Sequence, residues 1–347
     1  MLDLMSGDAA SVVVGAFGGL LLGLSARLGR FCTLGALEDF HLAGDATRLR
    51  MWGVALGASI LALHLAAALG WADPTASVYL AQRADLAAAA IGGLTFGIGM
   101  ALAGNCGLGA LARLGGGEMR SFVIVIVMGL AALATLSGPL SPLRVALFPP
   151  VLADSPQGIA HGIGALLSIP ASVVGIVSGG LLLLVALRGA SRRALWGLPV
   201  AFAIVSGFVG TTYLAATSFD AVPVRSHTFS APLGETMVWL MLSSGVPPGF
   251  GVGSVFGVLG GAWIGSRVRG VFRWEACDDH RELRRQIGGA ALMGVGAVLA
   301  VGCSIGQGLS AFALLAYTAP VALGGIWIGG AIGLKLMIEG RAAFFRV

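Results

Sequence analysis

The sequence predicts an all-α integral membrane protein with about nine transmembrane helices, short re-entrant half-helices and two inverted pseudo-repeats. Hydrophobic residues make up 57% of the 347-residue chain and charged residues only 11%, against about 25% charged in an average soluble protein. The apolar residues form runs long enough for helices, not the alternating segments of about ten residues that are typical of membrane β-barrels. The third observation is an internal repeat that contains a pair of cysteines.

Each predicted transmembrane helix is an apolar window of suitable length. A bilayer core of about 30 Å requires roughly 20 helical residues. Windows of this kind lie near residues 10–28, 51–71, 86–104, 121–138, 171–187, 195–216, 251–266, 288–303 and 320–339. Shorter apolar segments, which fit re-entrant or broken helices better, lie near 158–169, 233–244 and 306–318. Together these elements predict one transmembrane transport domain over residues 1–347.

The distribution of arginine orients these windows in the membrane. The chain carries 21 Lys+Arg against 16 Asp+Glu, a formal net charge of +5, which in a membrane protein marks cytoplasmic connections, so we expect no nucleic-acid partner. Arginines gather in the connections at 27–50, 113–120, 188–193 and 267–285, whereas those at 72–85, 139–157 and 217–235 hold one each. By the positive-inside rule the first group is cytoplasmic. We therefore expect a multi-pass protein of the bacterial inner membrane with its N-terminus outside, and no cleaved signal peptide.

An internal repeat links the two halves of the sequence. A shift of 197 positions aligns residues 92–109 with 289–306, and seven of eighteen positions match, including Cys106 with Cys303. The first copy runs inward and the second outward in the predicted topology, so the pseudo-repeats at 10–138 and 195–339 are expected to be inverted, as in many transporters. A weaker glycine echo between 15–27 and 257–269 has both copies running inward, which a simple inversion does not predict.

The repeat ends in two glycine-flanked cysteines. The two stretches are Gly104-Asn105-Cys106 and Gly302-Cys303-Ser304, the second followed by Gln307. Glycine there would let a helix break, and irregular backbone is tolerated at membrane depth only inside protein or around a cavity. Helix N-termini attract anions, and a polarizable thiol suits a soft, sulfur-bearing anion. The alternative, about equally weighted from residue types alone, is that glycine serves close packing and cysteine is a small buried residue.

Two other cysteines have plainer surroundings. Cys32 follows Arg30 at the cytoplasmic end of the first window, where an arginine beside a thiol can form an anion-contacting site or can simply fix topology. Cys277 lies in a strongly charged run, which is most simply a solvated cytoplasmic connection. No Cys-x-x-Cys or His-x-x-x-His spacing and no Walker motif occurs, so we expect no metal, no cofactor and no ATP-driven transport by this chain.

These residues resemble the YeeE/YedE sulfur-transport family, whose members include thiosulfate permeases. The resemblance rests on residues 96–109, 27–32 and 292–310 and extends over nearly the whole chain. It implies inverted helical halves whose two funnels narrow onto short half-helices, with cysteines along a central path. Cys106 and Cys303 match the central cysteines and Cys32 matches one near the inner end. A small cytoplasmic sulfur-carrier protein is a partner that the resemblance implies.

The functional hypothesis is a permease, not an enzyme, for thiosulfate or a related small sulfur anion. Its path would comprise Cys32, Cys106 and Cys303 together with Gly104, Asn105, Gly302, Ser304 and Gln307. One departure from the family concerns a further cysteine of the second half, because residues 242–248 contain none. The alternatives are a permease for another sulfur or selenium compound, a membrane-embedded enzyme that carries a persulfide on Cys106 or Cys303, and an assembly subunit.

Overall fold

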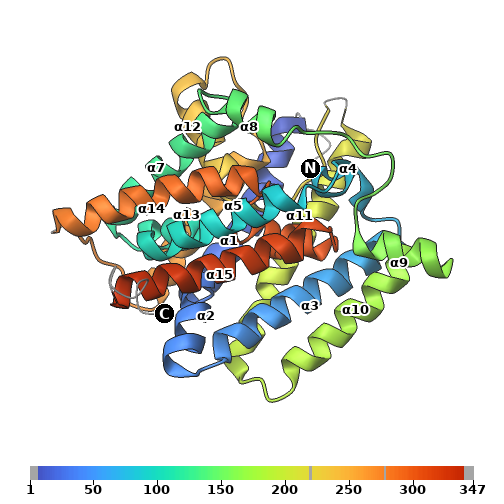
Figure 1. Ribbon diagram of the computed structural model, residues 1–347, viewed down its shortest axis with the longest axis horizontal. Helices are drawn as coiled ribbons and strands as arrows, with labels where there is room; N and C mark the ends of the chain where they lie inside the picture. Colours follow the sequence, from blue (N-terminus) through green and yellow to red (C-terminus); the bar gives the residue numbers. More distant parts are fainter. Residues whose placement is uncertain (1–6, 219–220, 277–278, 340–347) are drawn as a thin grey trace.

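The computed structural model describes residues 7–218, 221–276 and 279–339, and over these residues the chain is all-helical without a β-strand (Figure 1). The predicted α-helical class is confirmed. Six helical stretches are long and apolar enough to cross a membrane, or seven if α9 and α10, bent by 119° at their junction, count as one span. The chain is therefore a multi-pass membrane protein. Cys277 lies outside the described residues.

Every predicted window coincides with a helix. These helices are α1 (Gly7–Leu28), α3 (Thr47–Ala68), α5 (Leu86–Ala103), α7 (Met119–Leu136), α10 (Ala171–Leu187), α11 (Gly197–Thr217), α13 (Phe250–Val268), α14 (His280–Leu299) and α15 (Thr318–Glu339). Fewer helices than windows are long and apolar enough to cross a membrane by themselves, because α10 has only 17 residues, α13 is rich in glycine and α14 begins with a charged segment.

Short helices fill the remaining chain. They are α2 (Thr33–Glu38) with the π-helix η2 (Asp39–Ala43), η3 (Pro74–Ala76), α4 (Val78–Ala81), α6 (Gly107–Gly115), α8 (Ser141–Leu147), α9 (Ile159–Leu167), η4 (Arg192–Trp196), α12 (Ala231–Leu242) and the π-helix η5 (Gly306–Ala311). The three predicted short segments correspond to α9, α12 and η5. The sequence did not predict α2 and α6, because each follows directly on a long apolar window and its start is not visible as a change in hydropathy.

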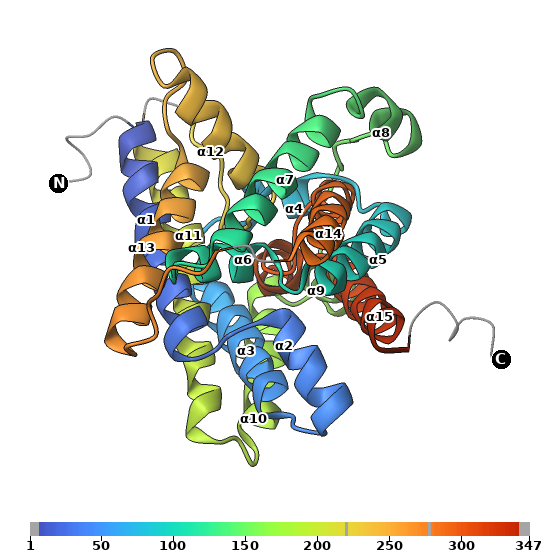
Figure 2. The ribbon, with the colours of Figure 1, turned by 90° about the vertical axis from the view of Figure 1, so that its left-hand side faces the viewer.

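Helices α1 and α13 pack along a seam of glycines (Figure 2). Gly15 lies against the Phe250 carbonyl, Gly19 against the Ser254 carbonyl and Gly23 against the Val258 carbonyl, and Gly257 in turn lies against the backbone of Ala16. Successive contacts advance in the same direction along both helices, so α1 and α13 are parallel. Small residues at four-residue intervals allow such close approach in membranes. The weaker glycine echo in the sequence therefore reflects a reciprocal packing seam.

Helix α5 lies between α14 and α15 (Figure 1). Gly92 packs against Gly296, and Gly99 packs against Gly289. The contact order runs in opposite directions along the two helices, so α5 and α14 are antiparallel. The two copies of the sequence repeat thus contact each other through their own matched glycines.

Candidate functional site

Cys106 lies where α5 breaks and α6 begins. Gly104 ends α5 in the left-handed conformation, with φ of 76°, and its N–H bonds to the carbonyl groups of Met100 and Ala101. Glycine adopts this conformation without steric cost. Cys106 then takes the extended conformation of an N-cap and is 1% exposed. The predicted helix break is therefore present, and the thiol lies at the start of the half-helix α6.

Cys32 has the same position at the start of α2. The chain leaves α1 through Arg30, whose φ is 58°, and the Cys32 Sγ accepts a hydrogen bond from the Gly35 N–H at 3.4 Å. The next residue, Thr33, is buried, and its Oγ1 donates to the Cys106 Sγ at 3.9 Å. The N-termini of α2 and α6 therefore meet, although 73 residues separate Thr33 from Cys106.

Cys303 follows the end of α14 and precedes η5. The chain turns at Val301, with φ of 57°, which corresponds to Gly104 in the repeat. The Cys303 Sγ is 3.3 Å from the Phe229 N–H and 3.6 Å from the Thr228 Oγ1, and the residue is 1% exposed. Sulfur therefore sits at the end of a second helix break, facing backbone and hydroxyl groups from another part of the chain.

Sequence reasoning missed Thr228 and Phe229. Both belong to the extended segment that leads from α11 to α12, and this segment is fixed at His227. The His227 carbonyl accepts from the Ser310 Oγ at 2.7 Å, and its Nδ1 lies 2.7 Å from the Ser254 Oγ. The polar run at 226–228, directly before an apolar segment, was the one signal in the sequence that could have indicated that this segment enters the protein interior.

The remaining predicted residues divide into two kinds. Asn105 Oδ1 and Ser304 Oγ are buried and form no hydrogen bond within the described part of the protein, so both are able to bind a solute. The Gln307 side chain is occupied instead: its Nε2 donates to the Ala300 carbonyl and its Oε1 accepts from the Thr318 Oγ1. Gln307 thus supports the break after α14.

A cavity of about 230 Å³ opens on the side of the molecule that holds Cys32. Cys32 and Gly104 line it together with four arginines, Arg27, Arg30, Arg48 and Arg113, and one acid, Glu38. Arg48 pairs with Asp39 and Arg113 with Glu118, so among the described residues Arg27 and Arg30 are the lining arginines without an ion pair, and such guanidinium groups attract small anions. We call this space the inner basin, after the orientation that the arginine distribution predicts.

A second cavity, of about 410 Å³, reaches the other cysteine site. Thr228 and Gly302 line it beside Arg144 and Arg225. Arg225 pairs with Glu235 at 3.4 Å, whereas Arg144 donates to the Thr135 and Leu136 carbonyl groups at the end of α7. In the same predicted orientation, we call this space the outer basin.

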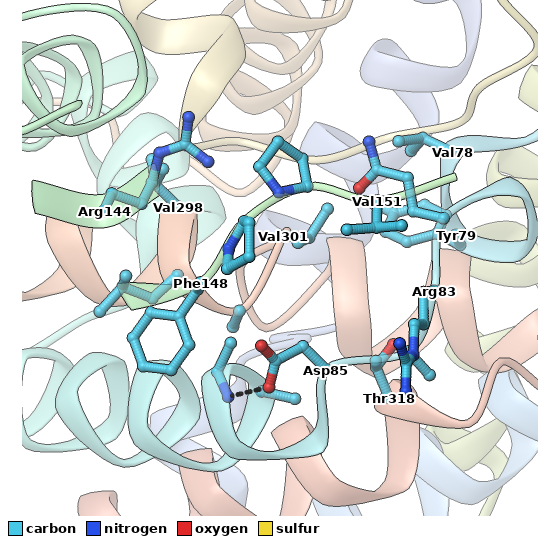
Figure 3. Close-up of a pocket in the computed structure, with 18 of the residues that line it drawn as sticks. Val78, Tyr79, Arg83, Asp85, Arg144, Phe148, Val151, Val298, Val301 and Thr318 are labelled. Carbon is cyan, nitrogen blue, oxygen red and sulfur yellow. Dashed lines mark hydrogen bonds between the residues drawn. The ribbon is translucent and has the colours of Figure 1, made fainter. Parts of the chain in front are cut away.

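A smaller pocket of about 70 Å³ adjoins the outer basin and shares Tyr79, Arg144 and Val301 with it. Figure 3 shows Arg144 and Phe148 at one side of this pocket and Arg83 at the other. Asp85 lies below and accepts from the Ala88 N–H at 2.9 Å, which caps α5. This side of the molecule therefore also presents arginine to solutes.

Phe229 links the two cysteine sites. Its N–H bonds to Cys303, and a Cβ at Gly107, beside Cys106, would lie 3.4 Å from the Phe229 Cβ and 3.1 Å from the Met128 Cε. Phe229 and Met128 are both fully buried. Apolar side chains thus pack at the narrow region between Cys106 and Cys303.

Comparison with known proteins identifies the family of the chain. Residues 28–332 match the family model described as sulphur transport. The chain belongs to the sulphur transport family. It is similar to the thiosulfate transporter TsuA of Spirochaeta thermophila, with 27% identity over 314 residues, 86% of this chain and 90% of that protein. It is also similar to the thiosulfate transporter TsuA of Escherichia coli, with 25% identity over 345 residues, 95% of this chain and 92% of that protein.

Membership of the sulphur transport family confirms the resemblance found in the sequence and assigns transport, not catalysis, to the chain. The persulfide-transfer enzyme among the alternatives is therefore set aside. Among the described residues, no group of three histidine, cysteine or acidic side chains could hold a metal ion.

Proposed function

We propose that this protein is an inner-membrane permease that takes up thiosulfate or a closely related small sulfur anion along a path through Cys303, Cys106 and Cys32. The observation that carries the proposal is the arrangement of thiols at helix breaks between two arginine-lined basins. Cys303 contacts Thr228 of the outer basin, and Cys32 lines the inner basin. The buried Cys106 connects to Cys32 through the adjacent Thr33.

The chemistry of the path suits a soft anion. Arginines of the outer basin would concentrate the anion at Thr228, and the Cys303 S–H would then donate to its sulfur or oxygen. The anion would next meet Cys106 at the N-terminus of α6, where unpaired N–H groups favour negative charge. Asn105 and Ser304 offer further polar atoms. We propose that both thiols act as neutral donors, since a thiolate would repel the anion and a covalent intermediate would make passage a chemical step.

The architecture that we propose has nine crossings and two inverted repeats, at 10–138 and 195–339. Its support is the reciprocity of the packing. Helix α5 packs on α15 as α14 packs on α7, and α1 packs on α13 as α11 packs on α3. The short helices follow the same scheme, since α6 contacts α7 and η5 contacts α15. The bent pair α9–α10 lies between the two repeats in the sequence, and α10 packs on α3.

Growth on thiosulfate tests the function. A host that lacks sulfate and thiosulfate uptake should grow on thiosulfate when it expresses this chain, and purified protein in vesicles should take up labelled thiosulfate. Absence of uptake by well-folded protein would contradict a thiosulfate permease. Competition by sulfite, sulfate and selenium analogues then decides between thiosulfate and another sulfur or selenium compound. This competition experiment is needed because the resemblance implies a further cysteine in thiosulfate permeases, which residues 242–248 lack. None of these residues lines the outer basin.

The orientation gives a prediction of its own. We expect residues 267–287 to be cytoplasmic and residues 139–157 external, because arginine gathers in the former. Single cysteines placed in each connection of a Cys-free variant should react with an impermeant reagent in intact cells only at 139–157. Labelling at 267–287 from outside would contradict the proposed orientation. The direction of the path and the assignment of the inner basin would then be reversed.

Cys32 should matter less than the two central cysteines. It lies in the arginine-lined inner basin, where the guanidinium groups of Arg27 and Arg30 would already attract an anion. We therefore expect Cys32→Ser to lower the uptake rate only partly, about twofold to fivefold, since a hydroxyl still donates. Complete loss of uptake in a well-expressed Cys32→Ser protein would show that this ranking is wrong. The same basin is where a small cytoplasmic sulfur-carrier protein would receive the anion.

A further inference from the structure

A groove of about 700 Å³ lies between α3, α10 and α15, away from the proposed path. Figure 1 shows these three helices neighbouring one another, with α15 above α3 and α10. Its walls are mostly apolar and include Leu56, Leu182, Leu323 and Trp327. A Cβ at Gly324 would meet no other atom within 4 Å, so the α15 side of the groove has unfilled space.

One end of the groove is positively charged. Arg50 lies in the first turn of α3, Arg188 directly follows α10, and both are exposed. Arg50 donates to the Gly189 carbonyl. Neither guanidinium forms an ion pair with a carboxylate among the described residues, and no acidic side chain lines the groove. The charged end therefore favours an anion.

The charged end and the apolar walls of the groove are arranged like the headgroup and the acyl chains of a phospholipid. Leu56 is six residues beyond Arg50 on α3, and Leu182 is six residues before Arg188 on α10, about 9 Å in each case at 1.5 Å per residue. A headgroup phosphate at the two arginines would thus place its acyl chain along the leucines of three membrane helices. In the orientation proposed above, this is the cytoplasmic leaflet.

We propose that this groove binds one anionic phospholipid, with its phosphate at Arg50 and Arg188 and an acyl chain against α3, α10 and α15. A phosphate satisfies both guanidinium groups, because arginine binds phosphate through paired hydrogen bonds. A second copy of the chain fits less well. A twofold interface through the same patch would bring each copy's two arginines together and would oppose association.

The groove also contacts segments that adjoin cysteines of the proposed path. Its wall contains Trp52, which stacks on Phe31 with ring centroids 4.9 Å apart. Phe31 precedes Cys32, and the other end of the Trp52 ring packs against Gly308 of η5. A lipid in the groove would therefore pack behind the segment that leads into α2 and behind η5, and its binding should stabilise the folded protein.

Native mass spectrometry of the delipidated full-length protein tests the proposal, with phosphatidylglycerol and phosphatidylethanolamine of identical chains as probes. We expect one phosphatidylglycerol to bind at least about tenfold more tightly than phosphatidylethanolamine. The double variant Arg50→Gln with Arg188→Gln should lose this preference, and Gly324→Phe should weaken binding of both lipids. The matched control, Arg192→Gln with Arg193→Gln, removes two arginines that do not line the groove and should bind as the wild type does.

Two outcomes would overturn the proposal. Equal binding of the two lipids, or equal loss in the control and groove variants, would show that no anionic headgroup site exists here. A dimer by light scattering that Gly324→Phe dissociates would assign the groove to a second copy. Because the readout is lipid binding to purified protein, its failure leaves the transport proposal untouched, and failure of transport leaves this one untouched.

Discussion

Replacing Cys303 or Cys106 by alanine should lower the uptake rate by about 10- to 100-fold while the protein remains folded. A hydrogen bond to a charged partner contributes about 1.5–3 kcal/mol, and alanine removes the only donor that each of these side chains offers to the anion. Cys303 is also the residue that Phe229 and Thr228 contact at the narrow region. Initial rates of labelled thiosulfate uptake in vesicles measure the effect.

The matched control is Cys277→Ala, which removes a thiol from the charged segment and should leave uptake unchanged. Cys106→Ser and Cys303→Ser should retain part of the activity, because a hydroxyl donates but is harder and less polarizable. Mass spectrometry after exposure to thiosulfate should find no added sulfur on either cysteine. A persulfide that forms and decays at the transport rate would contradict the neutral-donor mechanism and favour a covalent relay.

The second large effect concerns the seam between α1 and α13. A methyl group at Gly257 would overlap the carbonyl oxygen of Ala16, which is backbone and cannot rotate away. Overpacking of this kind costs about 1–3 kcal/mol, so Gly257→Ala should lower the Tm of the purified protein by on the order of 5 °C and reduce its yield.

Gly260 provides the control for this substitution on the same helix. A Cβ there meets no atom within 4 Å, so Gly260→Ala should be neutral or slightly stabilising, because alanine is the better helix former. Equal Tm values for the Gly257→Ala and Gly260→Ala proteins would show that the close packing of α1 on α13 contributes nothing to stability.

Much of the fold could be predicted because its signal is local. A run of apolar residues forms a helix in a membrane wherever it occurs, since its backbone groups must be satisfied within the segment. The windows at 86–104 and 320–339 therefore correspond to α5 and α15 within a few residues. The breaks at Cys106 and Cys303 were also visible, because glycine beside them permits the turn and the repeat drew attention to both.

The tertiary structure alone decided which groups surround each thiol. Thr33 meets Cys106 across 73 residues, and Phe229 meets Cys303 across 74. Neither contact leaves a trace in local hydropathy, because it depends on how helices cross and on where the segment between α11 and α12 returns into the protein. The glycines of α1 and α13 illustrate the same limit: the sequence displayed the spacing, but only packing showed that each row of glycines lies against the backbone of the other helix.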